Sequence, residues 1–169
     1  MTPNPHTPLH ITVATPDDRP LLEQLWTMFR HDMSEFSGAL PDPQARFRQE
    51  RLDAALSDPG WCAYLFWLAD APVGLAVVRG LESSVRVMSS FFLVRAARRS
   101  GYGLAAVEAL TVRHPGSWEV AFQGSNLTAA AFWRRAAAVV SVASWAEQRR
   151  EVPQREELPP DYWISFDVR

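Results

Sequence analysis

The feature that most constrains this chain is a glycine-rich bend at 98–103 (RRSGYG), placed between a predicted strand and a predicted helix. Glycine adopts backbone angles that other residues avoid and lets the backbone approach a ligand closely. The first turn of a helix presents unpaired N–H groups at the positive end of its dipole, which favours a bound phosphate. Three arginines add positive charge at the bend: Arg95, Arg98 and Arg99. The segment therefore predicts a pyrophosphate-binding turn.

Three other interpretations of the bend are a plain turn, a Walker-type loop and a Rossmann fingerprint. A lone Gly-x-Gly is also typical of a tight strand-to-helix turn with solvated arginines. No Gly-Lys-Ser/Thr follows the bend, which excludes a Walker-type phosphate loop. A Rossmann fingerprint fits poorly, because Ala106 is the nearest residue to a missing third glycine and the preceding strands are predicted to form hairpins.

Hydrophobic periodicity predicts a mixed α/β (α+β) fold in the order β-α-α-β-β-β-α-β-α-β-β. The short turns at 70–72 and 80–84 require antiparallel neighbours on either side of them. The predicted strands are 9–14, 61–69, 73–79, 85–94, 117–123, 139–145 and 162–168. The first predicted helix starts after the turn at 15–18 and runs to about Met33. Three further helices are predicted at 44–56, 101–114 and 125–138. The biased segment 149–160 is predicted to be a solvated loop.

The 169 residues fit a single domain at 9–169, preceded by a flexible, proline-rich tail at 1–8 without a signal pattern. The single cysteine, Cys62, cannot form an internal disulfide, so a cytoplasmic location is expected. A net charge of −2 argues against nucleic-acid or membrane binding. No metal-ligand spacing occurs, so no metal is expected.

The bend resembles a known family motif. Arg98-x-x-Gly101-x-Gly103 is similar to the Arg/Gln-x-x-Gly-x-Gly/Ala motif of the GNAT (Gcn5-related) N-acetyltransferases, and the predicted element order resembles that fold. The resemblance covers about 9–145 and is most specific over 91–133. It points to a bacterial branch with Phe-Phe before the motif and Asn…Phe-Trp-Arg after it. The downstream residues that carry it are Trp118-Glu119-Val120, Asn126-x-x-Ala129 and Phe132-Trp133.

The resemblance implies direct transfer of an acetyl or short acyl group from acetyl-CoA, the donor substrate, to an amine of a small molecule or peptide. The backbone of 93–94 would pair with the pantetheine arm like an added strand, and the bend would hold the pyrophosphate. Asn126 would bond the pantetheine, cap its own helix or do both. The Tyr102 phenol would face solvent or the adenine. The implied CoA-binding residues are Leu93, Val94, Arg95, Arg98, Arg99, Ser100, Gly101, Tyr102, Gly103, Asn126 and Trp133.

Two positions depart from the family pattern and leave catalysis unassigned. Trp133 stands where many members have a tyrosine that protonates the thiolate, and an indole N–H is not a usable acid near neutral pH. Ser90 stands where the branch has an acidic residue, and serine needs a neighbouring base to act. Losing one acid or base costs about 10²–10⁴-fold, whereas orientation supplies about 7–11 kcal/mol, so water-assisted transfer is feasible. Ser90 and Glu119 are the candidate catalytic residues, with a cross-strand surface pair as the other interpretation of Glu119.

Four residues are candidates for the acceptor pocket. His31 and Glu35 share a helical face near the expected acceptor loop, so a metal pair is one interpretation of them. No third ligand is evident, and a solvated helix end is the favoured alternative. Tyr64 and Trp67 would line the pocket or pack in the core. Asp32, Glu35 and Glu82 would give a mildly negative mouth.

Two rival functions keep part of this prediction. The first is a non-catalytic acyl-CoA-binding or sensing module, and the second is a nucleotide-binding protein unrelated to CoA. By analogy with the family, a homodimer through the final strands is also expected.

Overall fold

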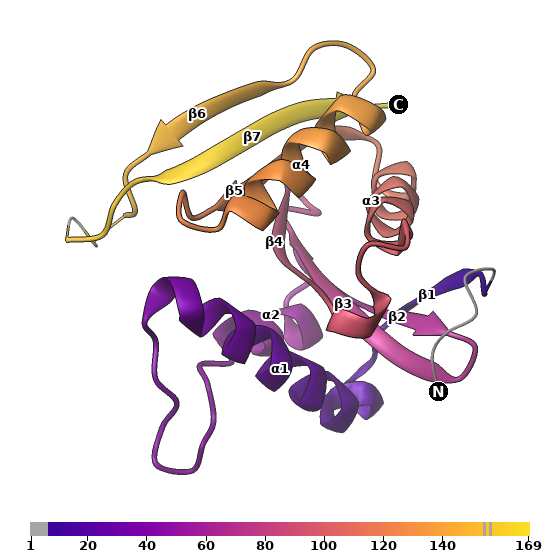
Figure 1. Cartoon of the computed structure of the whole chain (residues 1–169). Helices are drawn as coiled ribbons and strands as arrows, with labels where there is room; N and C mark the ends of the chain where they lie inside the picture. Colours follow the sequence, from indigo (N-terminus) through magenta and orange to yellow (C-terminus); the bar gives the residue numbers. More distant parts are fainter. Residues whose placement is uncertain (1–6, 154, 156) are drawn as a thin grey trace.

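The computed structural model describes residues 7–153, 155 and 157–169 (Figure 1). Most of the predicted flexible tail, residues 1–6, lies outside the described residues. Seven strands form one sheet in the order β1-β2-β3-β4-β5-β7-β6. The strands are β1 (Leu9–Val13), β2 (Trp61–Leu68), β3 (Ala71–Arg79), β4 (Val85–Leu93), β5 (Gly116–Phe122), β6 (Ala146–Arg150) and β7 (Asp161–Val168). Only the β4–β5 pair is parallel among these strands; the other pairs are antiparallel.

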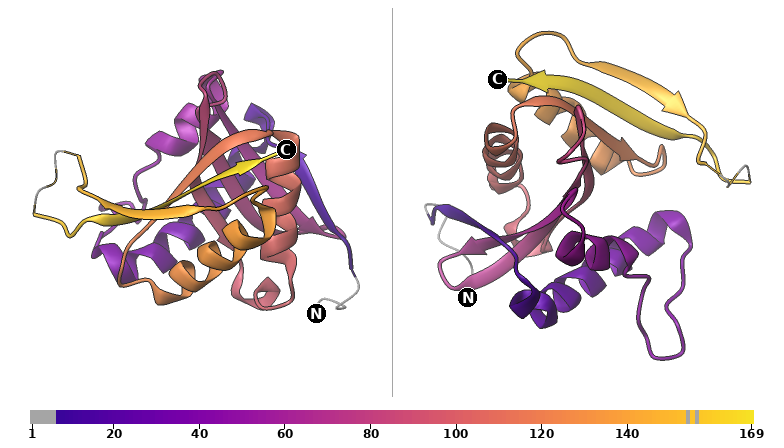
Figure 2. Two further views of the ribbon diagram at one scale, coloured as in Figure 1. Left: turned by 90° about the horizontal axis from the view of Figure 1, so that it is seen from above. Right: turned by 180° about the vertical axis from the view of Figure 1, so that it is seen from behind.

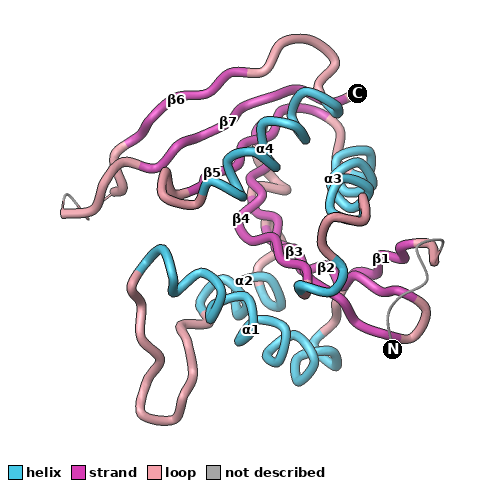
Figure 3. The backbone as a smooth tube through the Cα atoms, in the orientation of Figure 1, coloured by secondary structure: helices cyan, strands magenta, loops and turns pink. Residues whose placement is uncertain are grey.

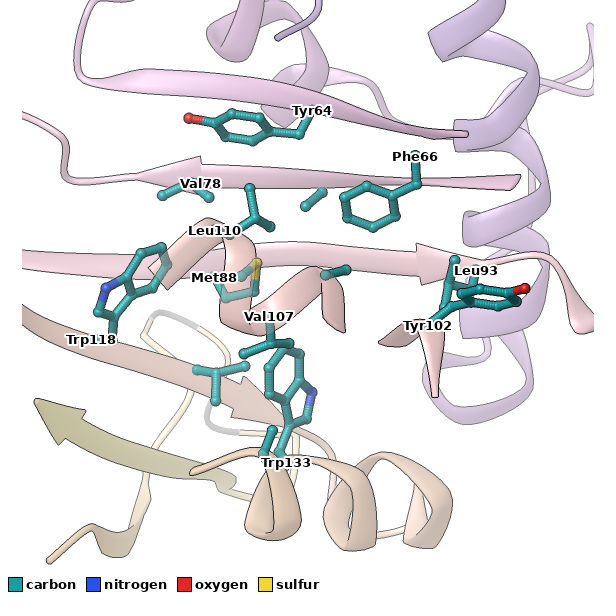
Figure 4. Packing of buried hydrophobic residues seen from close by; sticks show 14 of the residues in the cluster. Tyr64, Phe66, Val78, Met88, Leu93, Tyr102, Val107, Leu110, Trp118 and Trp133 are labelled. Carbon is teal, nitrogen blue, oxygen red and sulfur yellow. The ribbon is translucent and has the colours of Figure 1, made fainter. Parts of the chain in front are cut away.

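The helices cover opposite faces of the sheet, as two further views show (Figure 2). The α-helices are α1 (Arg19–Ser37), α2 (Glu50–Ser57), α3 (Tyr102–Arg113) and α4 (Leu127–Val140), and the 3₁₀ turns are η1 (Pro16–Asp18) and η2 (Arg95–Ala97). Side chains alternate along β3, so Leu75 and Val77 pack with α1 and α2, while Ala76 and Val78 pack in the cluster beneath α3 and α4. Figure 4 shows the second cluster, in which Trp118, Met88 and Val107 fill the space between sheet and helices.

The parallel pair β4–β5 is short and then opens. Its register joins Val85–Met88 of β4 to Ser117–Val120 of β5 and continues no further. At this point β4 also carries a bulge, because Met88 pairs with Val78 whereas Ser90 pairs with Val77, which leaves Ser89 as the extra residue. Beyond the bulge β4 pairs with β3 alone. One edge of β4, from Ser89 to Leu93, therefore lacks a neighbouring strand; we call this the β4–β5 opening.

The fold class and the element order match the prediction, but two boundaries were wrong. The predicted helix at 44–56 begins only at Glu50. The Asp42 carboxylate accepts hydrogen bonds from the backbone N–H groups of Gln44 and Arg46, and Ala45 has a left-handed φ of 59°. These side-chain bonds hold a turn that competes with the helix. Residues 38–49 consequently form a long loop (Figure 3).

The predicted strand at 139–145 was also wrong. Helix α4 continues to Val140, and the strand lies instead at 146–150 (AEQRR), partly inside the segment predicted as a loop. This strand is at the sheet edge and pairs only with β7, so its charged side chains stay at the surface. A polar edge strand of this kind lacks the apolar alternation that marks inner strands. In the described part of the chain, no helix combines the length and apolarity needed to cross a membrane.

Candidate functional site

The glycine-rich bend opens toward solvent at the N-terminus of α3. Arg99 and Gly101 both adopt left-handed backbone angles, with φ of 64° and 85°. A side-chain Cβ placed on Gly101 would meet no atom within 4 Å, so the space in front of the helix is open. Ser100 and Gly101 are exposed. The first N–H groups of an α-helix have no partners within the helix, and here they face a space that an anionic group can enter.

Arg98 braces the bend from within. Its Nε donates a 2.8 Å hydrogen bond to the carbonyl of Leu93, its guanidinium pairs with Asp32 of α1, and it lies 5.6 Å from the ring centre of Phe92. Arg95 also pairs with Asp32, at 3.0 Å. Burial would raise the pKa of the Asp32 carboxyl, but the hydrogen bonds from Arg98 and Arg95 outweigh burial and lower it. The Arg98 side chain therefore ties α1 to the end of β4.

Asp32 therefore does not supply the negative charge that the sequence analysis expected at the mouth of the acceptor pocket. Its charge is neutralised by the two arginines, and Glu82 lies in the β3–β4 turn. In contrast, the Arg99 guanidinium forms no hydrogen bond or ion pair within the described residues, and its side chain is exposed. Of the three arginines at the bend, Arg99 is the one whose guanidinium is available to an incoming phosphate.

Gly103 and Tyr102 serve packing as well as the bend. A Cβ on Gly103 would lie 3.0 Å from Cε2 of Phe132 and 3.6 Å from Cδ1 of Leu93, so glycine permits α3 to approach α4. Tyr102 is 7% exposed and lies in the cluster below α3 (Figure 4). The Tyr102 side chain therefore does not face solvent, because the first turn of α3 directs it into the core cluster; its predicted place beside the adenine stays a prediction.

Aromatic side chains pack on the α3–α4 side of β4. The Phe91 ring stacks on Phe132 with centroids 5.6 Å apart, and Trp133 meets Phe91 edge-on at 5.3 Å. Trp133 is 6% exposed and belongs to the core cluster. Asn126 caps α4, since its Oδ1 accepts a 3.0 Å hydrogen bond from the backbone N–H of Ala129. The helix-cap alternative for Asn126 is thus present in the structure.

The two predicted catalytic residues have contrasting surroundings. The Ser90 Oγ is buried without a hydrogen-bond partner in the part of the chain described. Ser90 lies on the same face as Phe92, toward α1 and α2. Glu119 accepts two hydrogen bonds from Arg150 of β6, at 3.0 and 2.6 Å. The bond from Arg150 lowers the Glu119 pKa against the opposing effect of burial, which makes this carboxylate a weak base.

The structure does not bring the four predicted acceptor-pocket residues together. His31 and Glu35 are exposed on α1. The Tyr64 hydroxyl pairs with the His114 ring beside the end of α3, on the other face of the sheet, and burial followed by Cys62 raises the Tyr64 pKa. Trp67 donates a 3.0 Å hydrogen bond to the Thr12 hydroxyl near the β1 edge. Across the described residues, no group of three or more His, Cys, Asp or Glu side chains is placed to hold a metal ion.

A residue that sequence reasoning missed lies directly at the opening. Arg51 of α2 donates a 2.6 Å hydrogen bond from Nη1 to the carbonyl of Ser89, the bulged residue. No motif marked Arg51, because α2 and β4 are separated by 38 positions in the chain at this contact. Only the position of the bulge reveals its role.

Comparison with known proteins adds the fold family. No protein-family model matches the sequence, and no curated protein matches it. An acetyltransferase from Thermus thermophilus superposes with a TM-score of 0.68, at 20% identity over 95% of this chain and 97% of its own. Arabidopsis thaliana NAA60 in complex with a bisubstrate analogue gives 0.63, at 11% identity over 95% and 98% of the two chains.

A third similar structure is a GNAT family acetyltransferase from Elizabethkingia anophelis with acetyl-CoA bound. Its TM-score is 0.62, at 10% identity over 95% of this chain and 98% of its own. The chain therefore has the GNAT acyl-CoA N-acyltransferase fold, as the bend and the element order predicted. At these identities the similarity is one of fold.

Proposed function

We propose that this protein is a CoA-dependent N-acyltransferase that moves an acetyl or short acyl group from acetyl-CoA directly to an amine of a small molecule or peptide. One observation carries the proposal: the unpaired β4 edge at the β4–β5 opening leads straight into the open, left-handed bend at the start of α3. An extended ligand arm paired with that edge would place a pyrophosphate at the helix N-terminus. The similarity in fold to acetyltransferases, one of them with acetyl-CoA bound, supports the same function.

The strand register refines which backbone groups would meet the donor. The Val94 N–H already donates to the Val73 carbonyl, so it faces β3. Neighbouring residues of a strand point their N–H and C=O groups to opposite sides, which turns those of Leu93 and Phe91 toward the opening. The Leu93 carbonyl accepts the bond from Arg98. We therefore assign donor pairing to the Leu93 N–H and to the backbone of Phe91, and give Val94 a supporting role.

The pyrophosphate contacts follow from the geometry of the bend. We assign them to the backbone of Ser100, Gly101 and Gly103 together with the Arg99 guanidinium, while Arg98 and Arg95 hold the bend to Asp32. Trp133 and Phe132 would flank the pantetheine arm from α4, and Asn126 keeps its capping role and lies close to the same helix end. The proposed donor site then consists of backbone groups of the bend and of β4 together with the Arg99 guanidinium.

In the transfer, the amine nitrogen bonds to the acyl carbon, the carbon–sulfur bond breaks, and the departing thiolate takes a proton while the amine loses one. Glu119 is committed to Arg150 and Trp133 has no acidic proton near neutral pH, so orientation supplies most of the acceleration. The Ser90 hydroxyl, buried on β4 next to the opening, is the other catalytic candidate and has no hydrogen-bond partner among the described residues. Proton transfers through water complete the reaction.

The same observations favour one alternative, a module that binds acyl-CoA without turnover. Its support is the commitment of Glu119 to an ion pair and the burial of Trp133. Thermal unfolding with acetyl-CoA, CoA, ATP and NAD tests the shared part of both proposals, because a ligand that binds the folded state raises the midpoint. Stabilisation by acetyl-CoA and CoA is expected. Stabilisation by ATP or NAD alone would refute both proposals and favour an unrelated nucleotide-binding protein.

A further inference from the structure

The face of the β4–β5 opening opposite to α3 and α4 is rich in arginine. Glu119 alternates with the core residues Trp118 and Val120, so its side chain points to this face. Arg150 of β6 pairs in register with Asp161 of β7, and its two hydrogen bonds to Glu119 place its guanidinium on the same face. We call the following residues the arginine group: Arg30 of α1, Arg48 before α2, Arg51 of α2, Arg79 of β3 and Arg150 of β6.

Arg51 lies at the centre of this group. Its guanidinium reaches the Ser89 carbonyl, which belongs to the β4 edge without a neighbouring strand. The Arg51 residue is exposed to solvent overall, yet the protein atoms packed around its guanidinium lower its pKa; the positive charges of Arg30, Arg79 and Arg48 lower it further, and Asp161 opposes them. Several like charges therefore surround one guanidinium, an arrangement that is unfavourable unless an anion joins it.

Arg30, a second member of the arginine group, has a donor without an acceptor. Its Nε is buried without a hydrogen-bond partner, and its guanidinium forms no ion pair within the described residues. Burial, followed by the charge of Arg48, lowers its pKa. Trp26 donates a 2.8 Å hydrogen bond to the Arg48 carbonyl and so fixes the loop before α2 against α1. An unpaired buried donor costs free energy, which a ligand that accepts from it recovers.

Within the described residues, carboxylates form ion pairs with two members of the arginine group and leave the other three without one. Arg48 pairs with Glu50 at 2.9 Å, and Arg150 pairs with Glu119. Burial raises the pKa of Asp161, against the opposing effect of Arg51, so its charge is the least favoured of the three. The guanidinium groups of Arg30, Arg51 and Arg79 form no ion pair with any residue the structure describes. The unpartnered Ser90 hydroxyl belongs to the residue that follows Ser89, whose carbonyl Arg51 contacts.

We infer that the acceptor of the proposed acyl transfer is an amine that also carries a carboxylate or phosphate, and that Arg51 and Arg30 bind this anionic group. The planar, five-donor guanidinium matches both anions. Because Arg51 contacts the opening itself, an anion bound there would bring an attached amine to the edge along which we place the donor. This inference rests on the proposed function, since it names the acceptor of that same site.

The test compares matched acceptors. Glycine and glycinamide differ in a carboxylate, and O-phosphoethanolamine and ethanolamine differ in a phosphate; spermidine supplies a cationic amine. Calorimetric binding to the CoA-loaded protein and kcat/KM for thiol release are measured for each. We expect each anionic compound to exceed its neutral match by about 10- to 100-fold, the range for a hydrogen bond to a charged group. Equal values within both pairs, or a preference for spermidine, would overturn the inference.

Variants locate the effect. Arg51→Gln and Arg30→Gln should remove most of the anionic preference and leave stabilisation by acetyl-CoA unchanged. Arg135→Gln is the matched control, because Arg135 is exposed on α4, across the sheet. An anionic preference that survives both substitutions would also refute the assignment. If acetyl-CoA does not bind at all but anions still bind in an Arg51-dependent manner, the acyl-transfer proposal fails while the anion site stands.

Discussion

The two faces of the β4–β5 opening differ in how they are built. The α3–α4 face joins residues close together in sequence: a bend at 98–103, the start of α3 and the aromatic side chains of α4. The α1–α2 face joins arginines from α1, α2, β3 and β6. The first face suits a donor whose recognition is largely through backbone groups. The second relies on charged side chains, so it can change with the acceptor while the fold stays the same.

The largest expected effect concerns the donor face. Gly101→Glu should reduce acetyl-CoA binding by more than about 100-fold, because a carboxylate at the mouth of the bend repels the pyrophosphate across only a few ångströms. Glutamate at a φ of 85° is strained by about 1–2 kcal/mol, but the fold should survive because a Cβ there meets no atom within 4 Å. Gly101→Asn is the control, because asparagine tolerates the left-handed conformation without adding charge. Calorimetric titration measures both; unchanged affinity in Gly101→Glu would mean that the bend is not the donor site.

The next effect tests the aromatic packing of the same face. Trp133→Ala removes a buried indole that contacts Phe91 and Phe132, and should lower the free energy of unfolding by about 3–5 kcal/mol. Urea denaturation measures this loss. Trp133→Phe, which keeps an aromatic ring, should lose much less. A loss under about 1 kcal/mol for the alanine variant would contradict a core position for Trp133.

A smaller effect tests the tie between the two faces. Asp32→Asn weakens the bonds to Arg98 and Arg95 and should cost about 1–3 kcal/mol near neutral pH. Its folded pKa lies below the ordinary 3.8, so the stabilisation is present above about pH 4 and is lost as the pH falls through the folded pKa. The variant should therefore lose less stability than the wild type between neutral pH and about pH 2. Parallel acid-unfolding curves for the two proteins would contradict the tie.

The smallest effect concerns Glu119. Since Arg150 lowers its pKa and occupies both oxygens, Glu119→Gln should change kcat by less than about threefold once binding is corrected for. A true general base would show a loss of about 10²–10⁴-fold. The pH profile of kcat for the two proteins distinguishes the outcomes, because only loss of a base removes an acidic limb.

Local signals explain what was predictable. The fold class, the short antiparallel turns and the 98–103 bend follow from periodicity and glycine placement, which act over a few residues. The position of β6 did not follow, because an edge strand of charged residues has no apolar alternation. The start of α2 was missed because Asp42 bonds to nearby backbone groups rather than allowing a helix.

The acceptor side was predictable to a lesser degree for a different reason. Arg51 becomes informative only when the bulge at Ser89 is placed against α2, and Arg30 only when its Nε is found buried. Tyr64 and Trp67 were candidates because they are aromatic, yet the strand register places Tyr64 against His114 and Trp67 against Thr12. Side-chain chemistry alone thus suggested candidates, but long-range strand register decided which of them reached the opening.

Thiol release from acetyl-CoA in the presence of pooled amines tests the central claim most directly. Wild-type protein should release CoA only when an acceptor is present, most rapidly with amines bearing a carboxylate or phosphate, and Gly101→Glu should release none. Binding of acetyl-CoA without release on any acceptor would leave a binding module in place of an enzyme. If the protein neither bound acetyl-CoA nor released CoA, that result would contradict the account as a whole.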